Sequence, residues 1–248
     1  MAGLVLLLGL IVGSFLNVVI ARLPAGRSLW RPRSACATCG AQIAWHDNIP
    51  LLSYALLRGH CRACGAAISA RYPLVEAATC LLFVAAYERF DVGIDFAVAA
   101  LLLAALVAIT AIDLDLQVIP DAITLPGIVA GIPANAASGW GSWSDSLLGI
   151  AVGGGLFLAI ILASGGGMGG GDMKLGAMLG AFLGWRLTLV AVFVAVVVGG
   201  AVAVAVLATG RKGRKDAIPF GPFLAVGGVT ALFWGQRLLT WYMEAFVG

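Results

Sequence analysis

Long apolar stretches fill most of the chain, and short polar segments separate them. A helix needs about 20 mostly apolar residues to cross the hydrocarbon core of a bilayer. The pattern predicts helices at residues 2–20, 74–87, 96–112, 119–137, 146–163, 175–185, 187–208 and 218–242. We therefore expect an all-α polytopic membrane protein with about eight transmembrane helices.

The composition supports this expectation. Of the 248 residues, 61% are hydrophobic and only 11% are charged, whereas soluble domains carry about 25% charged residues. The first apolar run lacks a basic segment before it and a clear small-residue cleavage site, so we interpret it as a retained helix rather than a signal peptide.

The basic residues predict an orientation. Residues 22–72 form the one sizeable polar segment, with a single acid, Asp47, and these arginines: Arg22, Arg27, Arg31, Arg33, Arg58, Arg62 and Arg71. Loops rich in Lys and Arg lie on the cytoplasmic side. Counting crossings from this loop places the second basic cluster, residues 211–215, on the same side, although that cluster was not used to set the orientation.

Four cysteines in the polar segment form two C-x-x-C pairs: Cys36, Cys39, Cys61 and Cys64. Four thiolates from two tight turns are typical of a closed, structural zinc site, and Gly40 and Gly65, directly after the pairs, suit such turns. In the cytoplasm disulfides are disfavoured, so redox-active pairs are the alternative that this spacing favours less. We assign no role to Cys80, which lies inside an apolar run, and expect His46 and His60 to be solvated.

Three acids follow the apolar run 96–112 within nine residues: Asp113, Asp115 and Asp121. In a purely structural interpretation, the three acids form a polar helix end. Asp121, directly after Pro120, would then interact favourably with the dipole of the next helix. Asp113 comes directly after the apolar run and is the acid expected to lie deepest. An acid at the edge of a hydrocarbon layer indicates a functional site by default.

A fourth acid, Asp172, ends the glycine-rich stretch 165–174 between two apolar runs. A flexible hinge would explain the glycines structurally. The functional interpretation is that the missing side chains, at Gly169 and Gly171 among others, let an extended substrate backbone approach Asp172. Lys174, two residues further on, is a supporting residue in that interpretation and an interface anchor otherwise.

Counting crossings places Asp113 and Asp172 on one membrane face. We predict that they meet as an aspartyl-protease pair, in which one carboxylate activates water and the other, protonated, polarises the scissile carbonyl. Asp115 and Asp121 are supporting residues in this prediction. Asn17, polar inside the first helix, either forms a hydrogen bond between helices or faces the substrate.

Taken in order, these motifs resemble the type IV prepilin peptidases over nearly the whole chain. The resemblance is carried by residues 13–24, the four cysteines with residues 45–54 between them, residues 68–76, residues 112–126, the glycine-aspartate motif 169–172 and residues 219–223. The motif 169–172 matches the GxGD sequence of intramembrane aspartyl proteases, although Gly170 stands where the family often has a larger residue.

The resemblance implies the activity, which the spacing does not show. The family cleaves the basic leader of type IV prepilins and pseudopilins after a glycine, at the cytoplasmic face of the bacterial inner membrane. It then methylates the new amino terminus with S-adenosylmethionine. By position, Asp113 and Asp172 would be catalytic, and the four cysteines would bind zinc.

The expected division is a first helix at 1–21, a cytoplasmic zinc-binding loop at 22–72 and a peptidase core at 73–248. The expected partners are prepilins and the lipid bilayer, and no nucleic acid. Two alternatives stay open: a leader peptidase without methyltransferase activity, since no S-adenosylmethionine motif is recognisable, and a transporter or scaffold with a zinc module.

Overall fold

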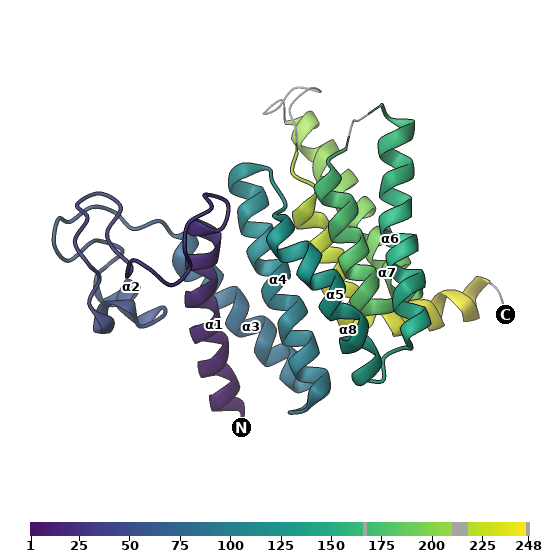
Figure 1. The fold of residues 1–248 in the computed structure, drawn as a ribbon, viewed down its shortest axis with the longest axis horizontal. Coiled ribbons are helices and arrows are strands. Elements are labelled where there is room, and N and C mark those ends of the chain that lie inside the picture. Colours follow the sequence, from purple (N-terminus) through teal and green to yellow (C-terminus); the bar gives the residue numbers. More distant parts are fainter. Residues whose placement is uncertain (166–167, 210–217, 247–248) are drawn as a thin grey trace.

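Helices account for almost all regular structure in the computed structural model, which describes residues 1–165, 168–209 and 218–246. Figure 1 shows these helices, which run in this order: α1 Ala2–Arg22, η1 Trp45–Asn48, α2 Leu52–Leu56, α3 Arg71–Phe90, α4 Ile94–Leu116, α5 Asp121–Ala137, α6 Trp143–Ala163, α7 Gly170–Ala208 and α8 Gly221–Phe246. Two isolated antiparallel β-bridges lie in the polar segment between α1 and α3. The prediction of an all-α protein is therefore confirmed.

Within the described ranges, four helices are long and apolar enough to cross a membrane: α1, α4, α6 and α7. The length and hydropathy of the helices therefore do not establish the predicted count of eight transmembrane helices. The second basic cluster, residues 211–215, lies outside the described residues, as do residues 166 and 167 of the glycine stretch.

Helix α7 is two helical segments that meet at a sharp turn. Gly184, at φ 72° and ψ 170°, is not helical. A β-carbon added to Gly153 on α6 would lie 2.2 Å from the Gly176 carbonyl oxygen and 3.1 Å from Thr188 Cγ2. In a straight helix Gly176 and Thr188 would be about 18 Å apart. The chain must therefore reverse at Gly184, close to where the sequence predicted a break between runs 175–185 and 187–208.

Glycines allow the helices to pack with their backbones nearly in contact. A β-carbon on Gly180 of α7 would lie 2.0 Å from the Gly149 carbonyl oxygen of α6, and one on Gly13 of α1 would lie 2.7 Å from the Glu76 α-carbon of α3. Such small-residue contacts are typical of packing between helices in membranes.

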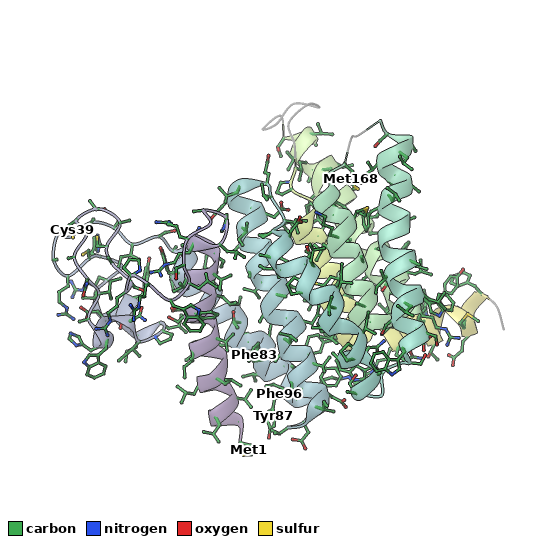
Figure 2. All side chains as sticks on the ribbon, viewed as in Figure 1. Met1, Cys39, Phe83, Tyr87, Phe96 and Met168 are labelled. Carbon is green, nitrogen blue, oxygen red and sulfur yellow. The ribbon has the colours of Figure 1, made fainter. Side chains whose placement is uncertain are left out.

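The hydrophobic core continues through the helical bundle. Phe83 of α3 and Phe96 of α4 are buried and meet edge to face at 6.1 Å, where Figure 2 labels them. Residues 23–70 lie outside this core, to the left of α1 in Figure 1. Figure 2 labels Cys39 in this loop, far from Met168, which precedes α7.

Candidate active site

Asp113 lies in the last turn of α4 and is only 4% exposed. The helix continues to Leu116, one turn beyond the predicted end at residue 112, so Asp113 is inside the helix rather than after it. One of its oxygens, Oδ2, accepts a hydrogen bond of 2.9 Å from the backbone N–H of Gly221. This bond orients the carboxyl group and joins the end of α4 to the start of α8.

Asp172 is the third residue of α7 and is half-buried. Its position in the first helical turn places a carboxylate at the positive end of the helix dipole, where negative charge is stabilised. A β-carbon on Gly169 would lie 3.5 Å from Asp172 Oδ2, and one on Gly171 would lie 2.9 Å from Cβ of Ile119. The glycine at position 171 therefore permits a close approach between α7 and the segment that links α4 to α5.

The two acids line the same cavity, of about 510 Å³. The two acids are 59 residues apart in sequence (172 minus 113) and come from different helices, α4 and α7. The cavity is bounded by the ends of α4, α7 and α8 and by these side chains and glycines: Gln117, Val118, Ile119, Asp121, Met168, Gly169, Gly171, Ile218, Pro219 and Phe220. The structure thus brings the predicted pair together in one pocket.

The supporting acids have basic partners. Arg71, at the start of α3, donates to Asp115, and Lys174 donates to both oxygens of Asp121 at 2.7 Å. Asp121 lines the cavity of the acid pair, whereas Asp115 and Lys174 do not. These ion pairs connect α3 to α4 and α5 to α7 at the end of the bundle that holds the pair.

Asn17 lies away from this cavity. Its side-chain nitrogen donates to the Tyr72 carbonyl at 3.0 Å, which joins α1 to α3. Of the two roles predicted for Asn17, the structure therefore contains the hydrogen bond between helices. Asn17 lines a different cavity, between α1, α3 and the polar loop.

Gly221 is the site residue that sequence reasoning missed. Residues 219–223 were part of the family resemblance, but nothing in the pattern gave Gly221 a role. A β-carbon there would lie 2.6 Å from Asp113 Oδ2. The only sequence signal was a glycine between two prolines at a helix start, which cannot show that its N–H reaches a residue 108 positions away.

The four cysteines meet in the polar loop. Their sulfur atoms all lie within 4.8 Å of one another, and the sulfurs of Cys36 and Cys64 are 3.9 Å apart. Tetrahedral zinc with bonds of about 2.3 Å to sulfur needs sulfurs about 3.8 Å apart. The residues therefore fit a four-thiolate metal site.

The two cysteine turns have the same backbone conformation and the same backbone hydrogen bond. Gly40 N–H donates to the Cys36 carbonyl and Gly65 N–H donates to the Cys61 carbonyl, each at 2.9 Å. Both glycines have positive φ, 72° and 71°, which L side chains rarely adopt. The sequence assigned these glycines to turns, and the structure confirms it.

The four thiols differ in acidity: hydrogen bonds with the sulfurs of Cys39, Cys61 and Cys36, together with burial, raise the pKa of Cys64 to about 11, whereas Cys36 is more acidic than usual. Backbone N–H groups of Cys39 and Thr38 donate to the sulfur of Cys36 and lower the pKa of that thiol to about 6, which favours the thiolate that binds metal. Nearby, Arg62 binds both oxygens of Asp47, at 2.8 and 2.6 Å, and this hydrogen-bonded pairing lowers the Asp47 pKa.

Comparison with known proteins gives the family. Residues 7–90 match the Bacterial Peptidase A24 N-terminal domain, and residues 100–204 match the Type IV leader peptidase family. A protein of Aeromonas hydrophila is 40% identical over 273 residues, which cover 98% of this chain and 94% of that protein. The chain belongs to the type IV leader peptidase family.

The relatives share one name, Prepilin leader peptidase/N-methyltransferase. It is carried by the Aeromonas protein, by one of Pseudomonas aeruginosa that is 39% identical over 96% of this chain and 92% of its own length, and by one of Myxococcus xanthus. The Myxococcus protein is 46% identical, and the match spans 64% of its length. No solved structure matches the chain significantly. The resemblance found in the sequence is thereby confirmed.

Proposed function

We propose that this protein is a membrane aspartyl endopeptidase that removes the leader of type IV prepilins and pseudopilins and then methylates the new amino terminus. Family membership and the names of the relatives support both activities. The observation that carries the peptidase assignment is the pair Asp113 and Asp172 in a single cavity at the ends of three helices.

The geometry supports a chemical role for each acid in hydrolysis. Asp113 is held by the Gly221 N–H on one oxygen, and its other oxygen is not constrained by that bond. A water between the carboxyl groups would lose a proton to the ionised acid and attack the scissile carbonyl carbon, while the protonated acid would give its proton to the carbonyl oxygen. Collapse of this intermediate breaks the C–N bond, returns the proton on oxygen to the pair and passes the proton taken from water to the leaving amine, so the pair acts as one unit. Gly169 and Gly171 leave room for the extended substrate backbone.

The location of the site fits the substrate. A prepilin has a basic leader followed by an apolar helix, so its cleavage site should lie where the helix leaves the bilayer. We propose that the end of the bundle with Asp113 and Asp172 faces the cytoplasm of a bacterial inner membrane. The arginine-rich loop that follows α1 supports this orientation.

We propose eight crossings, with α7 contributing two. The reversal at Gly184 supports this count, since each arm then forms a separate helical segment. We retain the division into a first helix at 1–21, a zinc loop at 22–72 and a peptidase core at 73–248. The loop would hold zinc through Cys36, Cys39, Cys61 and Cys64, and zinc bound to four protein sulfurs has no open position for catalysis. Its contribution would be to hold the loop folded.

The assignment is tested by incubating a purified prepilin with the purified protein, with and without S-adenosylmethionine. We expect the mass of the leader to be lost in both reactions, and the mass of one methyl group to be added only with the donor. Leader loss without methylation would favour the peptidase-only alternative. An uncut prepilin would reject the peptidase and favour the transporter or scaffold.

A further inference from the structure

Large apolar side chains are exposed on one short stretch of the metal loop, and we call them the apolar patch. Trp45 begins η1, Ile49 directly follows η1, and Leu52 and Leu56 are the ends of α2. Their exposed fractions are 76%, 40%, 52% and 73%. Their spacing resembles that of one face of a helix. Apolar groups that gather on a surface in this way mark a contact with a partner or a membrane.

The patch belongs to a folded unit that is attached to the helical bundle. The hydroxyl of Ser53, which is buried, accepts a hydrogen bond of 3.0 Å from the Ile49 N–H and donates one of 2.8 Å to the His46 carbonyl. These bonds join η1 to α2. The N–H of Leu51 donates to the carboxylate of Glu76 on α3 at 2.8 Å, and this bond ties the unit to α3.

The point of attachment lies well inside the end of α1. A β-carbon on Gly13 of α1 would lie 2.7 Å from the Glu76 α-carbon, so these two residues are at one level. Gly13 precedes Arg22, the last residue of α1, by nine residues (22 minus 13), or about 14 Å along the helix. The unit that Glu76 holds therefore returns beside α1, and Figure 1 shows α2 at the height of α1 rather than beyond its end.

A second contact has the same geometry. The ring of Trp30, which is exposed, lies 6.3 Å from the ring of Phe15 on α1. Phe15 precedes Arg22 by seven residues (22 minus 15), or about 10 Å along the helix. Two segments of the loop thus lie beside the part of α1 that is long and apolar enough to cross a membrane. That part has an exposed apolar row: Leu4, Leu8, Ile11 and Phe15.

The polar groups of the unit are suited to the edge of a hydrocarbon layer. Every backbone N–H from Ile49 to Ser53 donates to a protein acceptor, as a lipid environment requires because lipid tails offer no acceptor. The one acid in residues 45–57 is Asp47. Its side chain is 11% exposed and is bound to Arg62 through both oxygens, so its charge is paired, as charges at membrane depth usually are.

We infer that the apolar patch inserts into the bilayer leaflet at the Arg22 end of α1, where its side chains contact lipid acyl chains. The depth of the attachment decides for lipid, because lipid surrounds any surface that lies beside a membrane-crossing helix below its end. Arg58, exposed and directly after the unit, would reach the lipid phosphates. The inference rests on α1 crossing the bilayer, as proposed above, and not on the peptidase chemistry.

The insertion gives the metal loop a second attachment to the membrane besides α1. Figure 2 labels Cys39 near the height of the end of α1 that carries Arg22. The metal turns would therefore lie at the level of the lipid headgroups, with the apolar patch below them. Interfacial segments of this kind place their apolar face about 5–10 Å into the boundary between headgroups and acyl chains.

The test uses purified full-length protein in vesicles of phosphatidylglycerol and phosphatidylcholine. A small part of the phosphatidylcholine carries a photoreactive diazirine in its acyl chain, and labelled peptides are identified by mass spectrometry after irradiation. We expect label on residues 45–56 at a yield comparable to that on residues 4–15 of α1. Residues 36–40, which form the first cysteine turn, should carry only background label.

Each other outcome would overturn the inference. Label on residues 4–15 without label on residues 45–56 would leave α1 in the membrane and the patch outside it. Absence of label from both would remove the crossing on which the inference rests. Labelling of residues 45–56 by a water-soluble diazirine, as strongly as residues 36–40, would place the patch in water. Cross-links between residues 45–56 of two molecules, in place of lipid label, would show that a second copy covers the patch.

A variant tests the leucines directly. Moving one leucine side chain from lipid to water changes an equilibrium about tenfold or more, so Leu52→Asn, Leu56→Asn should lose about tenfold in label on residues 45–56. Its zinc content, which reports on the folded loop, should be retained. The control, Val92→Asn, Ile94→Asn, removes two exposed apolar side chains between α3 and α4 and should be labelled like wild type. Unchanged label on residues 45–56 of the Leu52→Asn, Leu56→Asn protein would contradict the insertion, and leader cleavage is measured separately.

Discussion

The aspartate cavity and the metal loop lie in different parts of the molecule, and different forces hold each of them together. Around the acids, helices pack with backbones in contact, as Gly149 and Gly180 show. In the loop, most residues from 23 to 70 are exposed or half-exposed, and Ser53 and Gly59 are the buried ones. A segment with so little buried surface cannot offset its conformational entropy by packing.

The difference shows what each region requires. The acid pair depends on helices that approach closely and fix two carboxyl groups, whereas the loop depends on four sulfurs that share one ion. Damage to one region should therefore leave the structure of the other intact. The following predictions test that independence, beginning with the largest effect.

Removing the metal should unfold the loop and spare the helices. Structural zinc contributes about 10 kcal/mol or more to folding of small zinc domains. In the double variant Cys36→Ser, Cys61→Ser we expect zinc content to fall to background and residues 23–70 to become sensitive to protease, with helical circular dichroism unchanged. The matched control, Cys80→Ser in α3, should keep its zinc. A protease-resistant loop without metal would show that packing holds it.

Adding one methyl group between α6 and α7 should destabilise the helices and leave the metal loop intact. In Gly180→Ala the β-carbon would lie 2.0 Å from a backbone oxygen, which cannot move aside cheaply. We expect the free energy of unfolding in mixed micelles to fall by about 3 kcal/mol, with zinc content unchanged. Gly155→Ala, with nothing within 4 Å of its β-carbon, is the control and should change the free energy of unfolding by less than about 1 kcal/mol. Equal stability of the two variants would contradict the packing account.

Gly221 should affect catalysis more than stability. In Gly221→Ala the β-carbon would lie 2.6 Å from Asp113 Oδ2, so the acid must shift and weaken its 2.9 Å bond to the backbone. Misplacement of a catalytic group by about 1 Å costs about 100-fold in rate. We expect kcat for leader cleavage to fall by about that factor, with KM little changed. The control is Gly200→Ala, on α7, where nothing lies within 4 Å of the added β-carbon, and it should cleave like wild type. A normal kcat for Gly221→Ala would show that Gly221 does not position Asp113.

The Lys174–Asp121 ion pair should contribute least. Both side chains are partly exposed, at 31% and 54%, and such pairs contribute about 1 kcal/mol or less. A double-mutant cycle with Lys174→Met and Asp121→Asn should give a coupling free energy below about 1 kcal/mol. Coupling well above that value would show that the pair is part of the framework that holds the acids.

The sequence predicted the parts that depend on local spacing. The cysteine turns were predictable because each C-x-x-C-G sequence makes its own turn, and two such turns can share one ion. The placement of Asp113 and Asp172 near helix ends was predictable because a long apolar run must end near an acid or a glycine stretch. The exact ends were not, since α4 ends at Leu116 rather than 112 and α7 begins at Gly170 rather than 175. Asp113 and Asp172 could therefore be predicted to lie on one face before the structure showed that they line one cavity.

The remaining features depend on contacts between distant segments. No local pattern pairs Arg71 with Asp115, or brings the Gly221 N–H to Asp113, because both depend on how α3 and α8 pack against α4. Asn17 shows the same limit, since its position in the sequence left open both a hydrogen bond to another helix and a substrate contact. The helix ends also shifted, with α3 running from Arg71 to Phe90 rather than 74–87, because its ends pack against neighbouring segments.

The most direct test of the catalytic pair is the rate of leader removal by Asp113→Asn and Asp172→Asn, which keep the size of each side chain and remove its acidity. Asp95→Asn, in the first turn of α4, is the control. We predict that each of the first two variants loses a factor of about 1,000 or more in rate, with zinc content and the free energy of unfolding retained, while the control cleaves normally. Cleavage near the wild-type rate by either Asp113→Asn or Asp172→Asn would contradict the account.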